Sequence, residues 1–459
     1  MEVRFTIRGN EQEIVFSPMK DKDGRMFLRS RVQTGETISI PIISKDESPI
    51  FKFKEAADYD RFEESQDIIN ERLYGVYEEW METMDNGFDA DGEFVTDSSK
   101  PGYSPDDIFV ENKPFSLKQL IDLIDSGDID LNPNFQRNFV WDKTRQSRLV
   151  ESIFLGLPLP SIYLSQYDDG ILTIVDGLQR LNTIRRFLKD ELRLYNLEYL
   201  IDCNGKTFSQ LAQVLPPLRL RRFSQTQIMC FVIDYRSPNK LKYDLFRRLN
   251  TGGKPLNNQE IRNCLSRLPL QKALKEMVSS DEFKNATDNS IKDTRMDAQE
   301  AALRFMYFYD QYKDPNGLDN YSGNMENTLD DYVESINRQK DFQNYISAYS
   351  QSMKDAFTLF GRYTFRKVYP NYINLRRNQV NKLLMMATCV LLAKHRDVYK
   401  NGIKCSKNLT SELATLIDSD TKFFYAITWS TNSKANILYV FEKLKENIFD
   451  KNLISNEQN

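Results

Sequence analysis

The period of the hydrophobic residues changes along the chain, and this change constrains the fold more than any other feature. Residues 1–56 alternate apolar and polar positions in short pieces, which is the period of β-strands. From about 113 to 265, helical patterns alternate with short apolar runs, and beyond Ser266 the pattern is helical almost throughout. We therefore expect an α+β protein with a small β-rich N-terminal unit, a compact α+β domain and an all-helical C-terminal domain.

Four segments follow from this pattern. The acidic stretch at 81–112 carries nine acidic residues and one lysine, and it buries too little apolar surface to stay ordered, so it is interpreted as a linker. The alternative is an acidic flap that mimics nucleic acid over a basic groove. Strands are expected at 161–164, 172–175 and 227–235, and helices at 295–313, 328–358, 373–396 and 435–448. The predicted domains are 1–80 (β-rich unit plus helix), 81–112 (linker), 113–265 (α+β) and 266–459 (helical).

The chain has 459 residues and a single histidine, His395. This count excludes sites that need two imidazoles, such as HExxH proteases, His-ligated zinc fingers and HNH-type nucleases. His395 lies in a helical run and is expected to be a helix-terminal cation. The five cysteines show no CxxC spacing, which is typical of reduced, buried thiols. Because no apolar run approaches the ~20 residues of a membrane span, we expect a soluble cytoplasmic protein.

The densest group of chemically useful residues follows the strand predicted at 172–175. Asp176 and Gly177 end this strand, and Arg180 lies in the first turn of the helix that follows. A helix N-terminus after a glycine turn presents free backbone N–H groups, which favour an anion such as phosphate. Arg180 would add donors suited to phosphate oxygens. Asp176 would hold a divalent cation or orient water, unless it only caps the helix.

Two further clusters flank this one in the sequence. In the first, Arg137 stands among aromatic residues and is either a phosphate clamp or a surface charge stacked on Trp141, while Asp142 caps the next helix. In the second, a helix ends near Asn250 and a glycine pair follows it. Asn257 and Glu260 then form a capping box for the next helix.

Taken together and in this order, the three clusters resemble the ParB/sulfiredoxin-like DGQQR-motif family. This family forms the N-terminal domain of GmrSD-type restriction enzymes and of related phage-defence proteins. The resemblance covers about 112–265, and position 178 is Leu where the family usually has Gln. The segments that carry it are 135–141 (FQRNFVW), 156–164 (GLPLPSIYL), 176–183 (DGLQRLNT) and 246–262 (FRRLNTGGKPLNNQEIR).

The resemblance implies a domain that binds and hydrolyses a nucleoside triphosphate (NTP) with Mg²⁺, and that acts on or senses DNA in restriction-type, anti-phage defence. Asp176, Gln179 and Arg180 would be catalytic, with Asp176 also as the metal ligand. The alternatives are a Mg²⁺-dependent DNA nuclease or nickase using the same cleft, and a non-catalytic, nucleotide-gated DNA sensor or adaptor. The nucleotide- or phosphate-binding residues would be Gln136, Arg137, Gly177, Asn182, Thr183, Asn250, Gly252 and Gly253.

A basic stretch at 361–410 carries eleven Lys or Arg residues and one acidic residue, with aromatic residues among them. Cations and stacking aromatics are typical of nucleic-acid surfaces, although a solvated helix face has the same composition. A second basic stretch, which includes Arg219, Arg221 and Arg222, would extend that surface or serve the nucleotide phosphates. DNA is the expected partner, and a partner protein or homo-oligomer is a further possibility. The predicted nucleic-acid-binding residues are Arg362, Arg366, Lys367, Arg376, Arg377 and Lys382.

Overall fold

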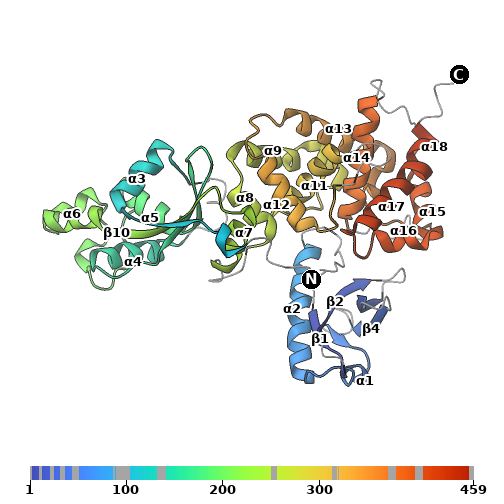
Figure 1. Cartoon of the computed structure of the whole chain (residues 1–459), viewed down its shortest axis with the longest axis horizontal. Coiled ribbons are helices and arrows are strands. Elements are labelled where there is room, and N and C mark those ends of the chain that lie inside the picture. The colour runs from blue at the N-terminus through green and yellow to red at the C-terminus, as the bar shows by residue number, and fades with distance from the viewer. Residues whose placement is uncertain are drawn as a thin grey trace. The chain divides into compact units, whose positions relative to one another are not determined.

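The computed structural model describes residues 3–9, 13–20, 25–31, 37–43, 51–85, 88, 104–131, 141–249, 256–312, 318, 320–370, 379–398 and 407–453. The chain forms two compact units, and the positions of its parts relative to one another are not determined (Figure 1). The first unit combines Met1–Ser98, Lys272–Leu329 and Asp341–Asn459. The second combines Ser99–Gln271 with Asp330–Lys340. The four-domain division of the sequence stays a prediction.

The N-terminal strands form an antiparallel sheet in the order β1-β2-β3-β4-β5. Phe5 and Phe16 from the sheet share a hydrophobic core with Ile69 and Leu73 from α2. The expected β-rich N-terminal unit is therefore confirmed. Its elements are β1 (Val3–Thr6), β2 (Glu13–Lys20), β3 (Met26–Arg31), β4 (Thr37–Ile43), β5 (Lys52–Phe53), α1 (Ala56–Tyr59) and α2 (Gln66–Asp85).

The second unit contains a five-stranded sheet in the order β6-β10-β8-β9-β7. The β10–β8 and β7–β9 pairs are parallel, whereas β6–β10 and β8–β9 are antiparallel. This mixed pairing confirms the α+β class. The elements are β6 (Val110–Ser116), α3 (Leu117–Ser126), β7 (Ile129–Asp130), α4 (Lys143–Phe154), β8 (Ile162–Gln166), β9 (Leu172–Asp176), α5 (Leu178–Leu188), α6 (Pro217–Gln225), β10 (Gln227–Ile233), α7 (Asn239–Leu249) and α8 (Asn258–Leu265).

Alternate residues of β9 face two different cores, because successive side chains of a strand point to opposite faces of the sheet. Ile174 packs into the core that α3, α4, α5 and α6 share with the sheet. Its neighbour Val175 packs with Phe246 of α7 and Ile261 of α8. Helices therefore cover both faces of the sheet at β9, and the strand that carries the main motif is held from both sides.

Regular structure extends into both ends of the predicted linker. Helix α2 continues to Asp85, and β6 begins at Val110, whereas 86–87 and 89–103 lie outside the described residues. Strand β6 contains Pro114 and two charged residues, and its side chains are mostly exposed. Its sequence therefore lacks the apolar alternation from which strands are predicted.

The regular elements beyond Ser266 are helices, which confirms the helical C-terminal region. The helix expected at 328–358 is two helices, α12 (Met325–Ile336) and α13 (Gln343–Phe360). Of the helix expected at 373–396, residues 373–378 lie outside the described residues, and α14 begins at Lys382. In the residues listed above, no helix combines the length and the apolar character that a membrane span requires. The helices are α9 (Leu268–Ser279), α10 (Asp281–Thr287), α11 (Asp297–Gln311), α12 (Met325–Ile336), α13 (Gln343–Phe360), α14 (Lys382–Val398), α15 (Thr410–Ser419), α16 (Thr421–Ala426), α17 (Lys434–Leu444) and α18 (Asp450–Leu453).

Candidate functional site

The turn from β9 into α5 requires glycine. Gly177 is the N-cap residue of α5 and has a φ of 103°, which side chains rarely adopt. A Cβ atom placed on it would lie 2.9 Å from Cγ1 of Ile162. No side chain makes a capping hydrogen bond at this helix start. The first turn of α5 therefore keeps backbone N–H groups for another acceptor, as anion-binding helix N-termini do.

Asp176 does not cap α5, so the simple capping interpretation of this residue is wrong. Its Oδ2 instead accepts a hydrogen bond from Nη2 of Arg180 at 2.7 Å, and the two side chains form an ion pair. The Asp176 side chain is 33% exposed and that of Arg180 is 11% exposed. Asp176 is thus a carboxylate held in one orientation at the end of β9, with part of its surface open to solvent.

The guanidinium of Arg180 is bound within the chain. Besides the ion pair, it donates to the carbonyl oxygen of Ser161 at 3.1 Å and to that of Pro160. Arg180 therefore ties the segment before β8 to the end of β9. This geometry makes Arg180 a positioning residue for Asp176, and its predicted role as a direct phosphate ligand is untested.

Gln179 contributes an unused donor next to this pair. Its Nε2 atom is buried and has no hydrogen-bond partner among the described residues, whereas its Oε1 accepts from the backbone N–H of Trp141 at 3.4 Å. Leaving a buried amide donor unpaired costs about 1–3 kcal/mol. Such an atom is a candidate for contact with a ligand or an ordered water. The ring of Trp141 itself lies under Arg145, at 4.5 Å from its guanidinium carbon.

The remaining predicted nucleotide-binding residues divide into two groups. Thr183 is buried and donates its hydroxyl to the carbonyl of Gln179 at 2.7 Å, so its hydroxyl proton is committed to its own helix. Asn182 is half-buried on α5. Gln136, Arg137, Asn250, Gly252 and Gly253 lie outside the described residues.

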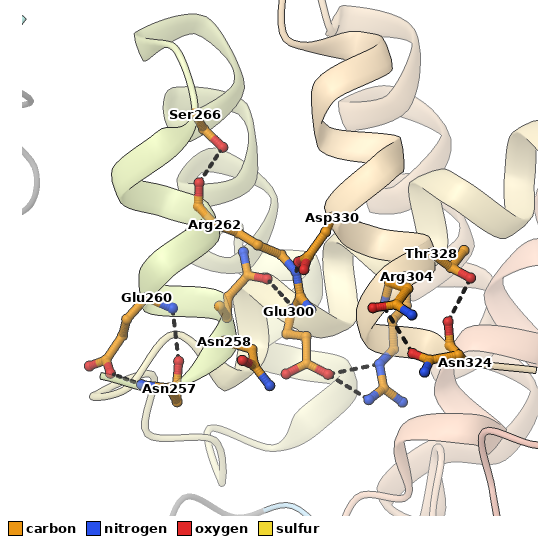
Figure 2. Close-up of polar contacts among 12 residues, drawn as sticks. Asn257, Asn258, Glu260, Arg262, Ser266, Glu300, Arg304, Asn324, Thr328 and Asp330 are labelled. Atoms are coloured by element: carbon orange, nitrogen blue, oxygen red, sulfur yellow. Dashed lines mark hydrogen bonds and ion pairs between the residues drawn. The ribbon is translucent and has the colours of Figure 1, made fainter. Parts of the chain in front are cut away.

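The helix after the glycine pair begins with the expected capping box. Asn257 accepts from the N–H of Glu260 at 2.8 Å, and Glu260 accepts from the N–H of Asn257 at 2.7 Å (Figure 2). The cap predicted at Asp142 is also confirmed, since its Oδ1 accepts from the N–H of Arg145 at 2.8 Å.

An acidic residue far along the sequence completes this part of the unit. The Nε of Arg262, whose side chain is 2% exposed, donates to Oδ1 of Asp330 at 2.7 Å (Figure 2). Arg247, at the end of α7, approaches Oδ2 of the same carboxylate at 3.4 Å. Sequence reasoning missed Asp330, because a counter-ion on a distant helix leaves no spacing signal near its partners.

The segment that follows Asp330 makes further contacts within the same unit. Oδ1 of Asn337 accepts from the N–H of Arg267 at 2.7 Å, and its Nδ2 donates to the carbonyl of Leu265 at 3.3 Å. Arg338 forms an ion pair with Asp168, in the turn between β8 and β9. Residues 330–340 are therefore a structural part of the motif-bearing unit.

Three of the cations predicted to bind nucleic acid are buried, so the prediction needs correction at these positions. Arg366 is 1% exposed and donates to the carbonyl of Thr287 and to Oγ of Ser290. Lys367 and Lys382 are each 9% exposed. Lys382 also pairs with Asp297 at 3.4 Å. Arg362 is exposed beside the Tyr363 ring, whereas Arg376 and Arg377 lie outside the described residues.

Other titratable groups are buried as well. His395 occupies the last turn of α14 as expected, but burial lowers its pKa, so it is neutral at pH 7 rather than a cation. Cys203, Cys230, Cys264 and Cys389 are free and buried, and Cys405 lies outside the described residues. Within the described residues, no group of three or more His, Cys, Asp or Glu side chains is arranged to hold a metal ion.

Comparison with known proteins supports one part of the sequence interpretation. No curated protein matches the chain. Residues 117–266, which include β7 to β10 and α3 to α8, match the family described as "GmrSD restriction endonuclease, N-terminal domain". The wider ParB/sulfiredoxin-like DGQQR assignment stays a prediction. The matched stretch is thus similar to the N-terminal domain of GmrSD restriction endonucleases, which supports a restriction-type function directed at DNA.

Proposed function

We propose that this protein is a nucleotide-dependent component of restriction-type, anti-phage defence. In this proposal it binds an NTP with Mg²⁺ at the N-terminus of α5, hydrolyses it, and acts on or senses DNA. The similarity of residues 117–266 to a restriction-endonuclease domain supports the DNA-directed part. The geometry around Gln179 supports the nucleotide part.

The unpaired Nε2 of Gln179 is the observation that carries the proposal. It lies on the first turn of a helix that has no side-chain cap and follows a glycine of positive φ. Uncapped amides and an amide donor together suit the oxygen atoms of a phosphate group. The same donors would stabilise the negative charge that develops on the transferring phosphoryl group.

Asp176 is the residue that would hold Mg²⁺. Its carboxylate is partly exposed and is oriented by Arg180 through Oδ2. Magnesium prefers oxygen ligands and commonly binds one or two carboxylates together with phosphate oxygens. When bound, the ion would neutralise phosphate charge. Arg180 would keep the carboxylate in place, and Gln179 would position the attacking water or a phosphate oxygen.

A phosphate-release screen over the four NTPs, with and without DNA, tests the proposal. We expect the full chain to release phosphate from at least one NTP in Mg²⁺, and Asp176→Asn to abolish release while keeping the wild-type circular dichroism spectrum. Glu198→Gln, an exposed change on the same unit, is the control and should retain activity. Unchanged turnover in Asp176→Asn would refute the assignment. Supercoiled plasmid in parallel reactions tests direct DNA cleavage.

Leu178 favours a second candidate, a nucleotide-gated sensor that binds without hydrolysis. This side chain packs against the core formed by α3 to α6, so it offers no polar contact where the family usually has Gln. Tight nucleotide binding by calorimetry, without phosphate release under any condition of the screen, would select this candidate.

A further inference from the structure

Helix α6 exposes three arginines that have no partner. Arg219, Arg221 and Arg222 are all exposed, and none forms an ion pair or a side-chain hydrogen bond with the described residues. The inner face of the helix is anchored by Phe223, which is 1% exposed. From 203 to 233 the sequence contains no Asp or Glu. Arg221 and Arg222 lie on the side of α6 away from Phe223, whereas Arg219, four residues before Phe223, flanks them. The exposed surface of α6 is thus positive.

Several other cations of this unit have acidic partners. Arg236 pairs with Asp234 at 2.8 Å, Lys113 with Glu111 at 2.5 Å, and Arg185 with Asp125 at 3.1 Å. An exposed cation that binds no ligand gains no stability from lacking an acidic neighbour. Acidic neighbours are also frequent in a chain with 66 acidic residues. The absence of an ion pair for three neighbouring arginines, within the part of the chain that the structure describes, is therefore the distinctive feature of α6.

The turn beside α6 extends this surface. Burial raises the pKa of the Cys203 thiol, the charge of Asp202 adds to that rise, and the charges of Lys206 and Arg219 oppose it. Both cations therefore lie within electrostatic reach of the 201–203 turn. Just before this turn, Tyr199 is 73% exposed. Arginines, a lysine and an exposed ring in neighbouring segments are the groups with which proteins bind nucleic-acid backbones.

We propose that the exposed arginines of α6, with Lys206 near Arg219, bind the phosphate backbone of duplex DNA. This inference rests on the DNA-directed part of the proposed function and locates its contact surface. It is a different surface from the one predicted at 361–410, where Arg366, Lys367 and Lys382 are buried. Contacts of this kind hold the duplex in place without reading its sequence. We expect binding that depends steeply on salt and little on sequence.

Fluorescence anisotropy with a labelled duplex tests the inference on the full chain. The triple variant Arg219→Gln/Arg221→Gln/Arg222→Gln should bind more weakly at low salt. Because each phosphate contact contributes about 0.9 to the slope of log K against log [salt], the slope should fall by about 2.7 in magnitude. The triple lysine variant retains the charges and should keep most of the slope.

The control variant Lys113→Gln/Arg236→Gln/Arg338→Gln removes the same charge from residues that have acidic partners, and it should bind DNA as the wild type does. An equal loss in this control, or wild-type binding by the α6 variant, would overturn the inference. Nucleotide hydrolysis without DNA should be the same in all variants. If the α6 variant changes the salt slope but the protein binds no nucleotide, only the proposed hydrolase is refuted. If the α6 variant hydrolyses nucleotide normally and binds DNA with wild-type affinity, only the α6 surface is refuted.

Discussion

Arg262 and Asp330 form a buried ion pair at 2.7 Å, although only Arg262 lies in the stretch that matches the GmrSD domain. Asp330 is also within 3.4 Å of Arg247, so one carboxylate serves the arginines on α7 and α8. These two helices precede and follow the glycine pair of the third motif. The motif-bearing unit is therefore completed by a residue from α12.

Replacing Asp330 should destabilise this unit strongly. Asp330→Ala leaves the buried charge of Arg262 without its counter-ion, and breaking a buried pair in this way costs about 3–5 kcal/mol. We expect a loss of this size in the free energy of unfolding, measured by urea denaturation. Asp331→Ala is the matched control, because this neighbour lies on the same helix and is exposed. Equal losses in the two variants would show that the ion pair contributes nothing of its own.

The sequence predicts those features that depend on neighbouring residues. The caps at Asp142 and at Asn257 with Glu260 follow from side chains three residues apart, and both are confirmed. Strands β8, β9 and β10 are apolar runs between turn residues, so they too are visible. The β9–Gly177–α5 turn is predicted for the same reason, since its geometry is set by one glycine.

Features that depend on tertiary contacts are not visible in the sequence. The sequence places Arg180 in a first helical turn, but its hydrogen bonds to the carbonyls of Pro160 and Ser161 arise only when β8 and β9 pair. Likewise, a count of cations at 361–410 contains no information about burial. Arg366 and Lys382 fall on inner surfaces, because packing of the helices decides which side of each segment meets solvent.

Glu151 should make stability depend on pH. Burial alone would raise its pKa, but hydrogen bonds from the N–H groups of Leu200, Tyr199 and Glu198 hold the pKa below its usual value of 4.5. A lowered pKa means that the folded state binds the proton less tightly than the unfolded state does. The stability that Glu151 contributes is therefore present above about pH 4.5 and is lost as the pH falls further.

The variant Glu151→Gln measures this contribution. Hydrogen bonds to a charged group are worth about 1.5–3 kcal/mol, so the variant should be less stable than the wild type by that order at pH 7. The difference should shrink as the pH drops below 4.5, in urea unfolding curves recorded across the range. A difference that stays constant with pH would mean that the charge of Glu151 is not what holds residues 198–200.

Gly177→Ala should cost more than a backbone effect alone. A residue with a side chain pays roughly 1–2 kcal/mol in the left-handed region, and the new Cβ would also lie 2.9 Å from Ile162. Gly170→Ala is the matched control, because Gly170 has a φ of 87° and nothing within 4 Å of its Cβ position. We expect a larger drop in melting temperature for Gly177→Ala than for Gly170→Ala. Equal drops would show that the Ile162 side chain moves away from the new Cβ atom without a loss of stability.

Gln179 and Gln146 allow effects on binding and on stability to be separated, because the side-chain donor of one is unpaired and that of the other is paired. Nε2 of Gln179 has no partner, whereas Gln146 donates to the carbonyl of Trp141 and accepts from Arg186 at 3.1 Å. Removing an unpaired buried donor relieves a cost, whereas removing a paired one leaves its partners unsatisfied, at about 1–3 kcal/mol. Gln179→Met also loses the long hydrogen bond that Oε1 accepts from Trp141 at 3.4 Å, so it should be about as stable as the wild type, while Gln146→Met should be destabilised.

If the donor of Gln179 contacts the phosphates, Gln179→Met should also weaken NTP binding at least tenfold in calorimetry, although its fold is intact. Gln146→Met should bind with wild-type affinity at temperatures where it is folded. Wild-type stability together with lost binding is what a residue held ready for a ligand produces, since its unpaired donor finds a partner only in that ligand. A Gln179→Met variant that is destabilised and still binds would assign the residue to the packing of α5 instead.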